Sequence, residues 1–150
     1  MSATVAKLYE TKTLGSAIDA TAPDGTAVRL LLSLAGGSMA HFELLAGGVS
    51  HAVTHRTVEE IWFVLSGRGS IWRRQDGQER IDALAPQTSL TIPLGTTFQF
   101  RAEAGAPFSF VAITMPPWPG MDEALPALGP WTPTVAAGSA SSALASGPPR

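Results

Sequence analysis

The chain has 150 residues, which is the size of one domain of ordinary length and leaves no room for a second. Its 10 Lys and Arg residues and 12 Asp and Glu residues give a formal net charge of −2. It therefore offers no basic field for a nucleic acid or an anionic membrane surface. The absence of cysteine excludes disulfides, thiolate metal sites and a cysteine nucleophile. We expect one site in one domain, with neither nucleic acid nor membrane as a partner.

The N-terminal sequence gives no sign of export. Its first residues lack the basic region, apolar run and small-residue cleavage site that a secretory signal would show. The apolar run at residues 28–34 is far too short to span a bilayer. We therefore expect a cytoplasmic protein.

Residues 1–26 predict an N-terminal arm. They mix Thr, Ala, Gly and Asp, and Pro23-Asp24-Gly25 is typical of a turn. The arm has room for one short strand. We expect it to pack on a partner subunit.

Residues 27–115 predict an antiparallel all-β domain. Short apolar or alternating runs follow one another, and glycine, proline or Asp-Gly signals separate most of them. No segment keeps a helical periodicity for three turns, so the pattern is typical of a sandwich or barrel. Asp76-Gly77 is the clearest hairpin signal. The expected strands cover residues 28–34, 39–45, 52–55, 61–65, 70–74, 89–92, 97–101 and 108–115.

Residues 116–133 predict an irregular strap, because prolines and glycines near its start remove hydrogen-bond donors and fix φ. Trp118 and Trp131 are its expected anchors on the barrel. Residues 134–150 contain mainly Ala, Ser, Gly and Pro. This composition predicts a disordered tail.

Three histidines lie close together in the sequence, at His41, His51 and His55, and two acids follow at Glu59 and Glu60. Alternate residues of a strand share one face. His51 and His55 would then point the same way, and Glu59 would point away from the face that holds Glu60. A tight turn between positions 55 and 60 would bring an imidazole and a carboxylate together across two strands.

The spacing around these residues resembles the first motif of the cupins. The matching positions are Gly47, Val53, His55, Glu60 and Gly67. This motif leads into the run from Glu59 to Gly69, which is similar to the usual entry into a cupin barrel.

A second motif strengthens the resemblance. Pro93-Leu-Gly95-Thr-Thr-Phe98 resembles the Pro-x-Gly-x-x-His core of the second cupin motif, with Phe98 at the histidine position. The resemblance covers roughly residues 28–115. It implies a small single-domain cupin with one conserved barrel, a double-stranded β-helix also described as a jelly roll. An apolar outer sheet face and the arm, together with the resemblance, imply a homodimer.

The ligand set of the motif is incomplete. In metal-dependent cupins, two histidines and a glutamate from the first motif and a histidine from the second bind one divalent ion, such as Fe, Mn, Ni or Zn. Here only His55 and Glu60 match, because Val53 and Phe98 occupy the other two positions and Ala102 replaces the usual asparagine. Catalytic metal sites generally use at least three protein ligands. The resemblance thus implies a degenerate metal site.

A metal would need a recruited ligand, either His51 or His41. Four residues of extended strand separate the Cα atoms of His51 and His55 by about 13 Å. Only a bend or bulge at His51 could close that distance. The strand that holds His41 cannot be placed beside the site from the sequence.

Without a metal, the site predicts an apolar pocket with one acid–base pair. His55 and Glu60 are the candidate catalytic residues, because an apolar interior would desolvate them and shift their pKa values. A buried hydrogen-bonded pair without function is the plainer interpretation, and an aromatic side chain such as Trp62 is more often simply core. The candidate ligand-binding residues are His51, Val53, Trp62, Phe98 and Phe100.

Three functions are compatible with this pocket. The first is a small-molecule-binding protein that acts as a metal-independent isomerase, cyclase or lyase through proton transfer by Glu60 and His55. The second is a non-catalytic ligand-binding or sensing module. The third is a divergent metal-dependent enzyme, similar to a dioxygenase, that uses His55 and Glu60 with His51 or His41.

Overall fold

The computed structural model describes residues 7–138, and their regular structure is almost entirely β. The only helix in this part of the chain is the short 3₁₀ helix η1 (Met121–Glu123). None of the helical structure within residues 7–138 is long and apolar enough to cross a membrane. The strands are β1 (Ala20–Thr21), β2 (Ala27–Leu34), β3 (Gly37–Leu44), β4 (Val53–His55), β5 (Glu59–Ser66), β6 (Gly69–Gln75), β7 (Gln78–Leu84), β8 (Ser89–Ile92), β9 (Thr97–Ala102), β10 (Phe108–Met115) and β11 (Ala124–Pro126).

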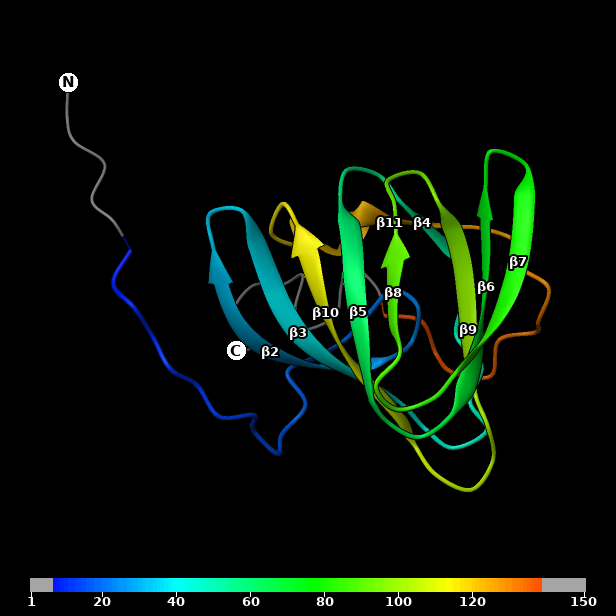
Figure 1. The fold of residues 1–150 in the computed structure, drawn as a ribbon, viewed down its shortest axis with the longest axis horizontal. Helices are drawn as coiled ribbons and strands as arrows, with labels where there is room; N and C mark the ends of the chain where they lie inside the picture. The colour runs from blue at the N-terminus through cyan, green and yellow to red at the C-terminus, as the bar shows by residue number, and fades with distance from the viewer. Residues whose placement is uncertain (1–6, 139–150) are drawn as a thin grey trace.

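The strands form two antiparallel sheets that face each other around the core, as Figure 1 shows. One sheet has the order β1-β2-β3-β10-β5-β8, and the other has the order β11-β4-β9-β6-β7. This is the all-β jelly-roll arrangement that the sequence predicts, although the two sheets do not close into a continuous barrel. The expected strands are present, with small differences at their ends.

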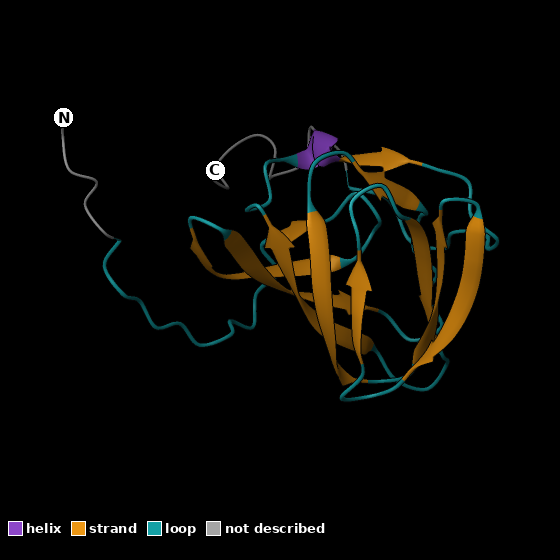
Figure 2. Ribbon diagram, turned by 45° about the horizontal axis from the view of Figure 1, so that its top comes forward, coloured by secondary structure: helices purple, strands orange, loops and turns teal. Residues whose placement is uncertain are grey.

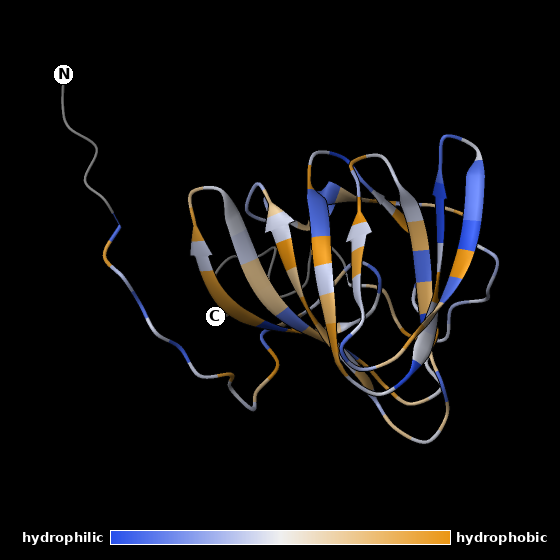
Figure 3. Ribbon diagram, viewed as in Figure 1, coloured by the Kyte–Doolittle hydropathy of each residue, from blue (hydrophilic) through white to orange (hydrophobic). Residues whose placement is uncertain are grey.

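Alternation along β5 decides which side chains enter the core. Trp62 and Val64 are buried, whereas Ile61 and Phe63 between them are exposed. In β9 the hydropathy alternates in the same way, as the bands in Figure 3 show, although Gln99 on the outward face is also buried, where it is hydrogen-bonded to Trp131 of the strap. This is the behaviour of strands that have one face on a core and the other outside.

The motif glycines are required by the backbone. Gly67 has a φ of 77°, and a Cβ there would lie 2.2 Å from the carbonyl oxygen of Pro107. Neither the conformation nor the contact tolerates a side chain. The predicted hairpin between β6 and β7 turns at Asp76 and Gly77, both with positive φ. Such a turn matches the twist of the two strands.

The strap (residues 116–133) is irregular at its start but adds a strand to the second sheet. Its β11 pairs with β4, beside η1 in Figure 2. Trp131 anchors the strap, because its backbone N–H donates to Gln99 Oε1 and its ring lies under the Arg101 guanidinium, 4.1 Å from the ring centre. The sequence indicated the anchor but not β11.

Five residues of the expected disordered tail are placed on the barrel. The Thr134 N–H donates to the Val49 carbonyl, the Gly138 N–H donates to the Ala22 carbonyl, and Val135 packs against the core. These residues differ from the sequence-based expectation because carbonyl groups outside the named strands, at Val49 and Ala22, accept their N–H groups. The rest of the expected tail, residues 139–150, lies outside the described residues.

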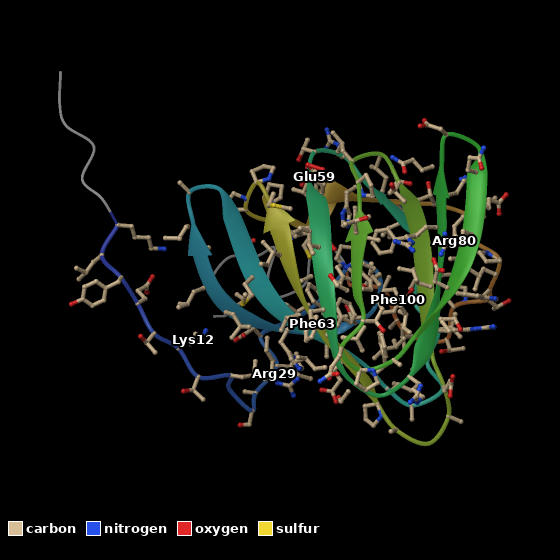
Figure 4. All side chains as sticks on the ribbon, in the orientation of Figure 1. Lys12, Arg29, Glu59, Phe63, Arg80 and Phe100 are labelled. Carbon is tan, nitrogen blue, oxygen red and sulfur yellow. The ribbon has the colours of Figure 1, made fainter. Side chains whose placement is uncertain are left out.

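Residues 7–19 of the arm lie outside the two sheets on the side of β2 (Figure 1; Lys12 in Figure 4), and hydrogen bonds from Lys7 Nζ to the Ser33 carbonyl and from the Asp19 N–H to the Val28 carbonyl connect them to that strand. The outer face of the six-stranded sheet exposes a group of large apolar side chains: Met39, Ile61, Phe63, Leu65 and Ile113. Phe63 is labelled on this face in Figure 4. The homodimer expected from such a face and from the arm stays a prediction.

Candidate functional site

A cavity of about 270 Å³ lies between the two sheets. Most of its wall is apolar, with Leu30, Phe42, Phe110 and Ala112 among the lining residues. Polar groups enter it at Asp24, Ser33, Ser38, His55, Glu60 and Thr114. A recessed, mostly apolar space with few polar groups is typical of a small-molecule site.

Glu60 lies on β5 at one of the alternate positions whose side chains point inward, and its side chain enters this cavity. Its side chain is 6 % exposed, and its Oε1 accepts a hydrogen bond of 2.6 Å from Trp62 Nε1. Burial raises the pKa of Glu60 to about 8, against the opposing effect of the Trp62 hydrogen bond, and the charges of Asp24 and Glu123 raise it further. Glu60 is therefore a neutral carboxylic acid near neutral pH.

His55 enters from the end of β4. Its Nδ1 lies 3.6 Å from Glu60 Oε2, which is beyond hydrogen-bond distance. This nitrogen has no hydrogen-bond partner among the described residues. Burial lowers the pKa of His55 to about 4, although the charge of Glu123 opposes this. His55 is thus neutral near neutral pH, and its contact with Glu60 is a contact of two uncharged groups.

Two aromatic rings fix the imidazole of His55. Phe98 meets it edge-on at a centroid distance of 5.2 Å, and Trp118 of the strap meets it at 5.3 Å, also edge-on. Such edge-on contacts hold a ring in place without using its nitrogens. The Nδ1 atom of His55 is therefore left for Glu60 and for a ligand.

The turn between His55 and Glu60 is held by Glu123 of η1. Its carboxylate accepts hydrogen bonds from the Thr57 N–H, the Thr57 hydroxyl and the Val58 N–H. Burial acts to raise the pKa of Glu123, but these hydrogen bonds outweigh it and hold the pKa below its usual value. Glu123 thus stays ionised and fixes the spacing of the pair from the strap side.

The structure brings most of the predicted site residues together. Val53, Trp62 and Phe98 line the cavity beside His55 and Glu60. Phe100 does not line it. It lies on β9 (Figure 4) and packs edge-on against Trp62, with ring centroids 5.1 Å apart.

The other two histidines lie outside the cavity. His51 Nε2 is 2.7 Å from the Val135 carbonyl oxygen and packs under the strap. It precedes β4, so the strand alternation that predicts a common face for His51 and His55 does not apply. His41 lies between Ala40 and Phe42, which both line the cavity, and so it points to the opposite face of β3.

Three residues of the site were missed in the sequence. Asp24 lines the cavity, Glu123 holds the turn, and Trp118 contacts His55. Asp24 had been assigned only to a turn and Trp118 only to an anchor. All three reach the site through contacts between distant parts of the chain, for which one sequence has no signal.

The residues of the cavity do not form a ligand set for the divalent metal that the cupin resemblance implies. The two missing ligand positions, Val53 and Phe98, face the cavity as packed apolar groups. Residues 7–138 contain no group of three or more His, Cys, Asp or Glu side chains that could hold a metal ion. Neither His51 nor His41 completes the set, because neither lines the cavity.

Comparisons with known proteins identify the fold. No protein-family model matches the chain, and no curated protein matches it. Among solved structures, a variant of oxalate decarboxylase from Bacillus subtilis matches with a TM-score of 0.67 at 14% identity, over 84% of this chain and 34% of that one. The capsular polysaccharide assembling protein CapF from Staphylococcus aureus matches with a TM-score of 0.61 at 14% identity, over 74% and 35%.

A third solved structure is an uncharacterised protein with a double-stranded β-helix domain from Klebsiella pneumoniae. It matches with a TM-score of 0.53 at 15% identity, over 61% of this chain and 76% of that one. The chain spans only about a third of oxalate decarboxylase and CapF. At these identities, the matches establish the cupin-type double-stranded β-helix fold and leave the activity open.

Proposed function

We propose that the protein binds a small, largely apolar carbonyl compound in its cavity and moves protons on it with Glu60 and His55, as an isomerase, cyclase or lyase does. The observation that supports this is the pair itself. A neutral carboxylic acid and a neutral imidazole lie 3.6 Å apart at the wall of an apolar cavity. One is ready to donate a proton and the other is ready to accept one.

Glu60 and His55 suit the two proton transfers of an enolisation, which are protonation of the carbonyl oxygen and removal of a proton from the adjacent carbon. Glu60 Oε2–H donates a hydrogen bond to the ligand carbonyl oxygen, and His55 Nδ1 takes the proton from the adjacent carbon. The C–H electron pair forms the enol double bond while the carbonyl oxygen receives the Glu60 proton. Return of the proton to a different carbon gives an isomer, and loss of a neighbouring leaving group gives a lyase reaction.

The surroundings stabilise the charges that this step creates. After the transfer, Glu60 is a carboxylate and His55 an imidazolium, so the two form an ion pair and the cavity gains no net charge. Trp62 Nε1 already donates to Glu60 Oε1, and the charge of Glu123 favours the imidazolium. A preorganised polar environment of this kind lowers the barrier in a water-poor site.

Deuterium uptake tests the proposal. The protein is incubated in D₂O with the enolisable ketone para-methylacetophenone, and NMR follows the loss of its acetyl proton signal. We expect uptake faster than in buffer, and we expect Glu60→Gln to slow it by about 10²-fold or more, as the loss of a general acid does. The matched control is Glu59→Gln, because Glu59 is the exposed neighbour on the same strand.

The outcomes separate the candidate functions. An unchanged rate in Glu60→Gln would remove Glu60 from the chemistry. Saturable binding of the ketone without any uptake in the wild type would favour the non-catalytic binding module instead.

A further inference from the structure

We propose that Asp24 forms a second polar subsite of the cavity, which accepts a hydrogen bond from a hydroxyl group on an uncharged carbonyl compound with an apolar body. This inference rests on the proposed function, because it assigns the ligand carbonyl to Glu60. It adds a second anchoring point and thereby narrows the class of ligand.

Asp24 is buried and held in one orientation. It lies in the turn between β1 and β2, is 9 % exposed, and lines the cavity. Its Oδ1 accepts two hydrogen bonds from Thr26, one of 3.0 Å from the backbone N–H and one of 2.6 Å from the hydroxyl. The N–H of His51 donates to the Asp24 carbonyl oxygen at 2.9 Å. The carboxyl group is therefore fixed by Thr26, and its turn is fixed by His51.

The second carboxyl oxygen of Asp24 is not used by the fold. Both hydrogen bonds from Thr26 end on Oδ1, and Oδ2 receives none from residues 7–138. Oδ2 is not one of the fully buried polar atoms that lack a partner, so it remains within reach of a donor in the cavity. Burial also raises the pKa of Asp24, with the Thr26 hydrogen bonds and the charge of His51 opposing this. A donor supplied by a ligand would satisfy the free oxygen.

The two acids act within one space. The charge of Asp24 contributes to the raised pKa of Glu60, so the two carboxyl groups interact. Both line the same cavity, and leucine side chains of β2 line it too. A ligand that donates to Asp24 and presents a carbonyl to Glu60 would fill the apolar space between them with its carbon skeleton.

The residues that line the cavity also argue against an anionic ligand. Its only titratable residues are Asp24, His55 and Glu60, and no lysine or arginine lines the cavity. A carboxylate, phosphate or sulfate would meet two acids and no cation in a water-poor space, where charges interact strongly. The chemistry therefore favours an uncharged hydroxyketone over an acid of similar size.

Three probes of nearly equal size test the subsite by NMR titration. They are para-(hydroxymethyl)acetophenone, para-methylacetophenone, which lacks the hydroxyl, and para-acetylbenzoate, which is anionic. We expect the hydroxymethyl compound to bind about tenfold more tightly than the methyl compound, as one hydrogen bond to a charged or buried acceptor allows. We expect the benzoate to bind most weakly.

Two variants assign the preference to Asp24. Asp24→Ala should remove the tenfold preference. The matched control is Asp19→Asn, because Asp19 is an exposed acid beside the same strand β2, does not line the cavity, and keeps an acceptor for the Leu30 N–H when it is changed to Asn, so this variant should keep the preference. Equal affinities in the wild type, a preference that survives Asp24→Ala, or its loss in Asp19→Asn would each overturn the inference.

The probes also separate this inference from the proposed function. If para-methylacetophenone binds and exchanges in a Glu60-dependent way but the hydroxyl adds no affinity, the proposed function stands and the Asp24 subsite falls. If none of the probes binds the wild type, both fall together.

Discussion

Two glutamates, one in the barrel interior and one in the strap, show how surroundings set the behaviour of the same side chain. Both are buried, Glu60 with 6 % and Glu123 with 3 % of its surface exposed. Glu60 accepts one hydrogen bond from Trp62, and its pKa rises to about 8. Glu123 accepts three from Thr57 and Val58, and its pKa falls. Burial raises the pKa of a carboxyl group, and enough donors reverse the effect.

Because their pKa values differ, Glu60 and Glu123 have different roles around His55. Glu123 stays charged and serves the structure, because it saturates the backbone of the turn that links β4 to β5. Glu60 stays protonated, and its Oε2 makes no hydrogen bond to another residue of the described part of the chain. The site thus combines Glu123, an ionised group that holds the turn, with Glu60, a neutral acid beside His55. Different measurements test these two roles.

Removal of the Glu123 carboxylate is expected to have the largest effect. In Glu123→Ala the Thr57 and Val58 N–H groups lose their acceptor, and we expect the free energy of unfolding to fall by about 3 kcal/mol, as measured by urea denaturation. The control is Asp122→Ala, whose exposed carboxylate pairs with Arg56 at 3.4 Å from the same 3₁₀ helix. Exposed pairs contribute about 0–1 kcal/mol. Equal losses in the two variants would contradict the role given to Glu123.

The raised pKa of Glu60 makes stability depend on pH. The folded state holds the Glu60 proton up to about 8, whereas the unfolded carboxyl releases it near 4.5. Its contribution is therefore complete at low pH and is lost as pH rises through about 8. The lowered pKa of His55 acts in the opposite direction between about 4 and 6.5, so the two effects offset each other there.

Above about pH 6.5 the titration of His55 is complete in both states, so the raised pKa of Glu60 acts without this offset. We expect the free energy of unfolding to fall by roughly 2 kcal/mol between about pH 6.5 and pH 8 in the wild type. In Glu60→Gln, which keeps an acceptor for Trp62 but cannot ionise, the curve should be flat over this range. Urea denaturation at a series of pH values measures it. A flat wild-type curve would show that Glu60 is already ionised.

The sequence predicted the fold well because its signals are local. The glycine at position 67 and the Asp76-Gly77 turn each report a backbone constraint within a few residues, and alternation reports which side of a strand is buried. The apolar residues at Val53 and Phe98 likewise predicted an apolar pocket, and both line the cavity. Such features need no knowledge of distant contacts.

The site was predicted only in part for the same reason. His55 and Glu60 flank one turn, so their meeting followed from spacing. Asp24 and Glu123 lie far from that turn in the sequence and reach it only through the packing of the arm and the strap. His51 was expected on the same strand face as His55 on the assumption that the strand began before it, whereas β4 begins at Val53.

Metal binding is expected to have the smallest effect in the wild type. It tests whether Glu60 differs from Glu123 in its protonation state. A resident divalent cation would hold Glu60 ionised and so remove its difference from Glu123. Because only His55 and Glu60 offer ligands, we expect protein purified without a histidine tag to contain far less than one equivalent of Fe, Mn, Ni or Zn by elemental analysis. A near-stoichiometric metal would overturn the assignment of Glu60 as a neutral acid.

A double variant provides the positive control for that measurement. Val53 and Phe98 are directly opposite each other on β4 and β9, and both line the cavity beside His55. Val53→His with Phe98→His therefore puts two further imidazoles on the wall that holds His55 and faces Glu60. We expect this variant to take up zinc or nickel while the wild type does not, because four ligands then converge where two did before. In the loaded variant the fall in stability between about pH 6.5 and pH 8 should disappear, since the cation keeps Glu60 ionised throughout.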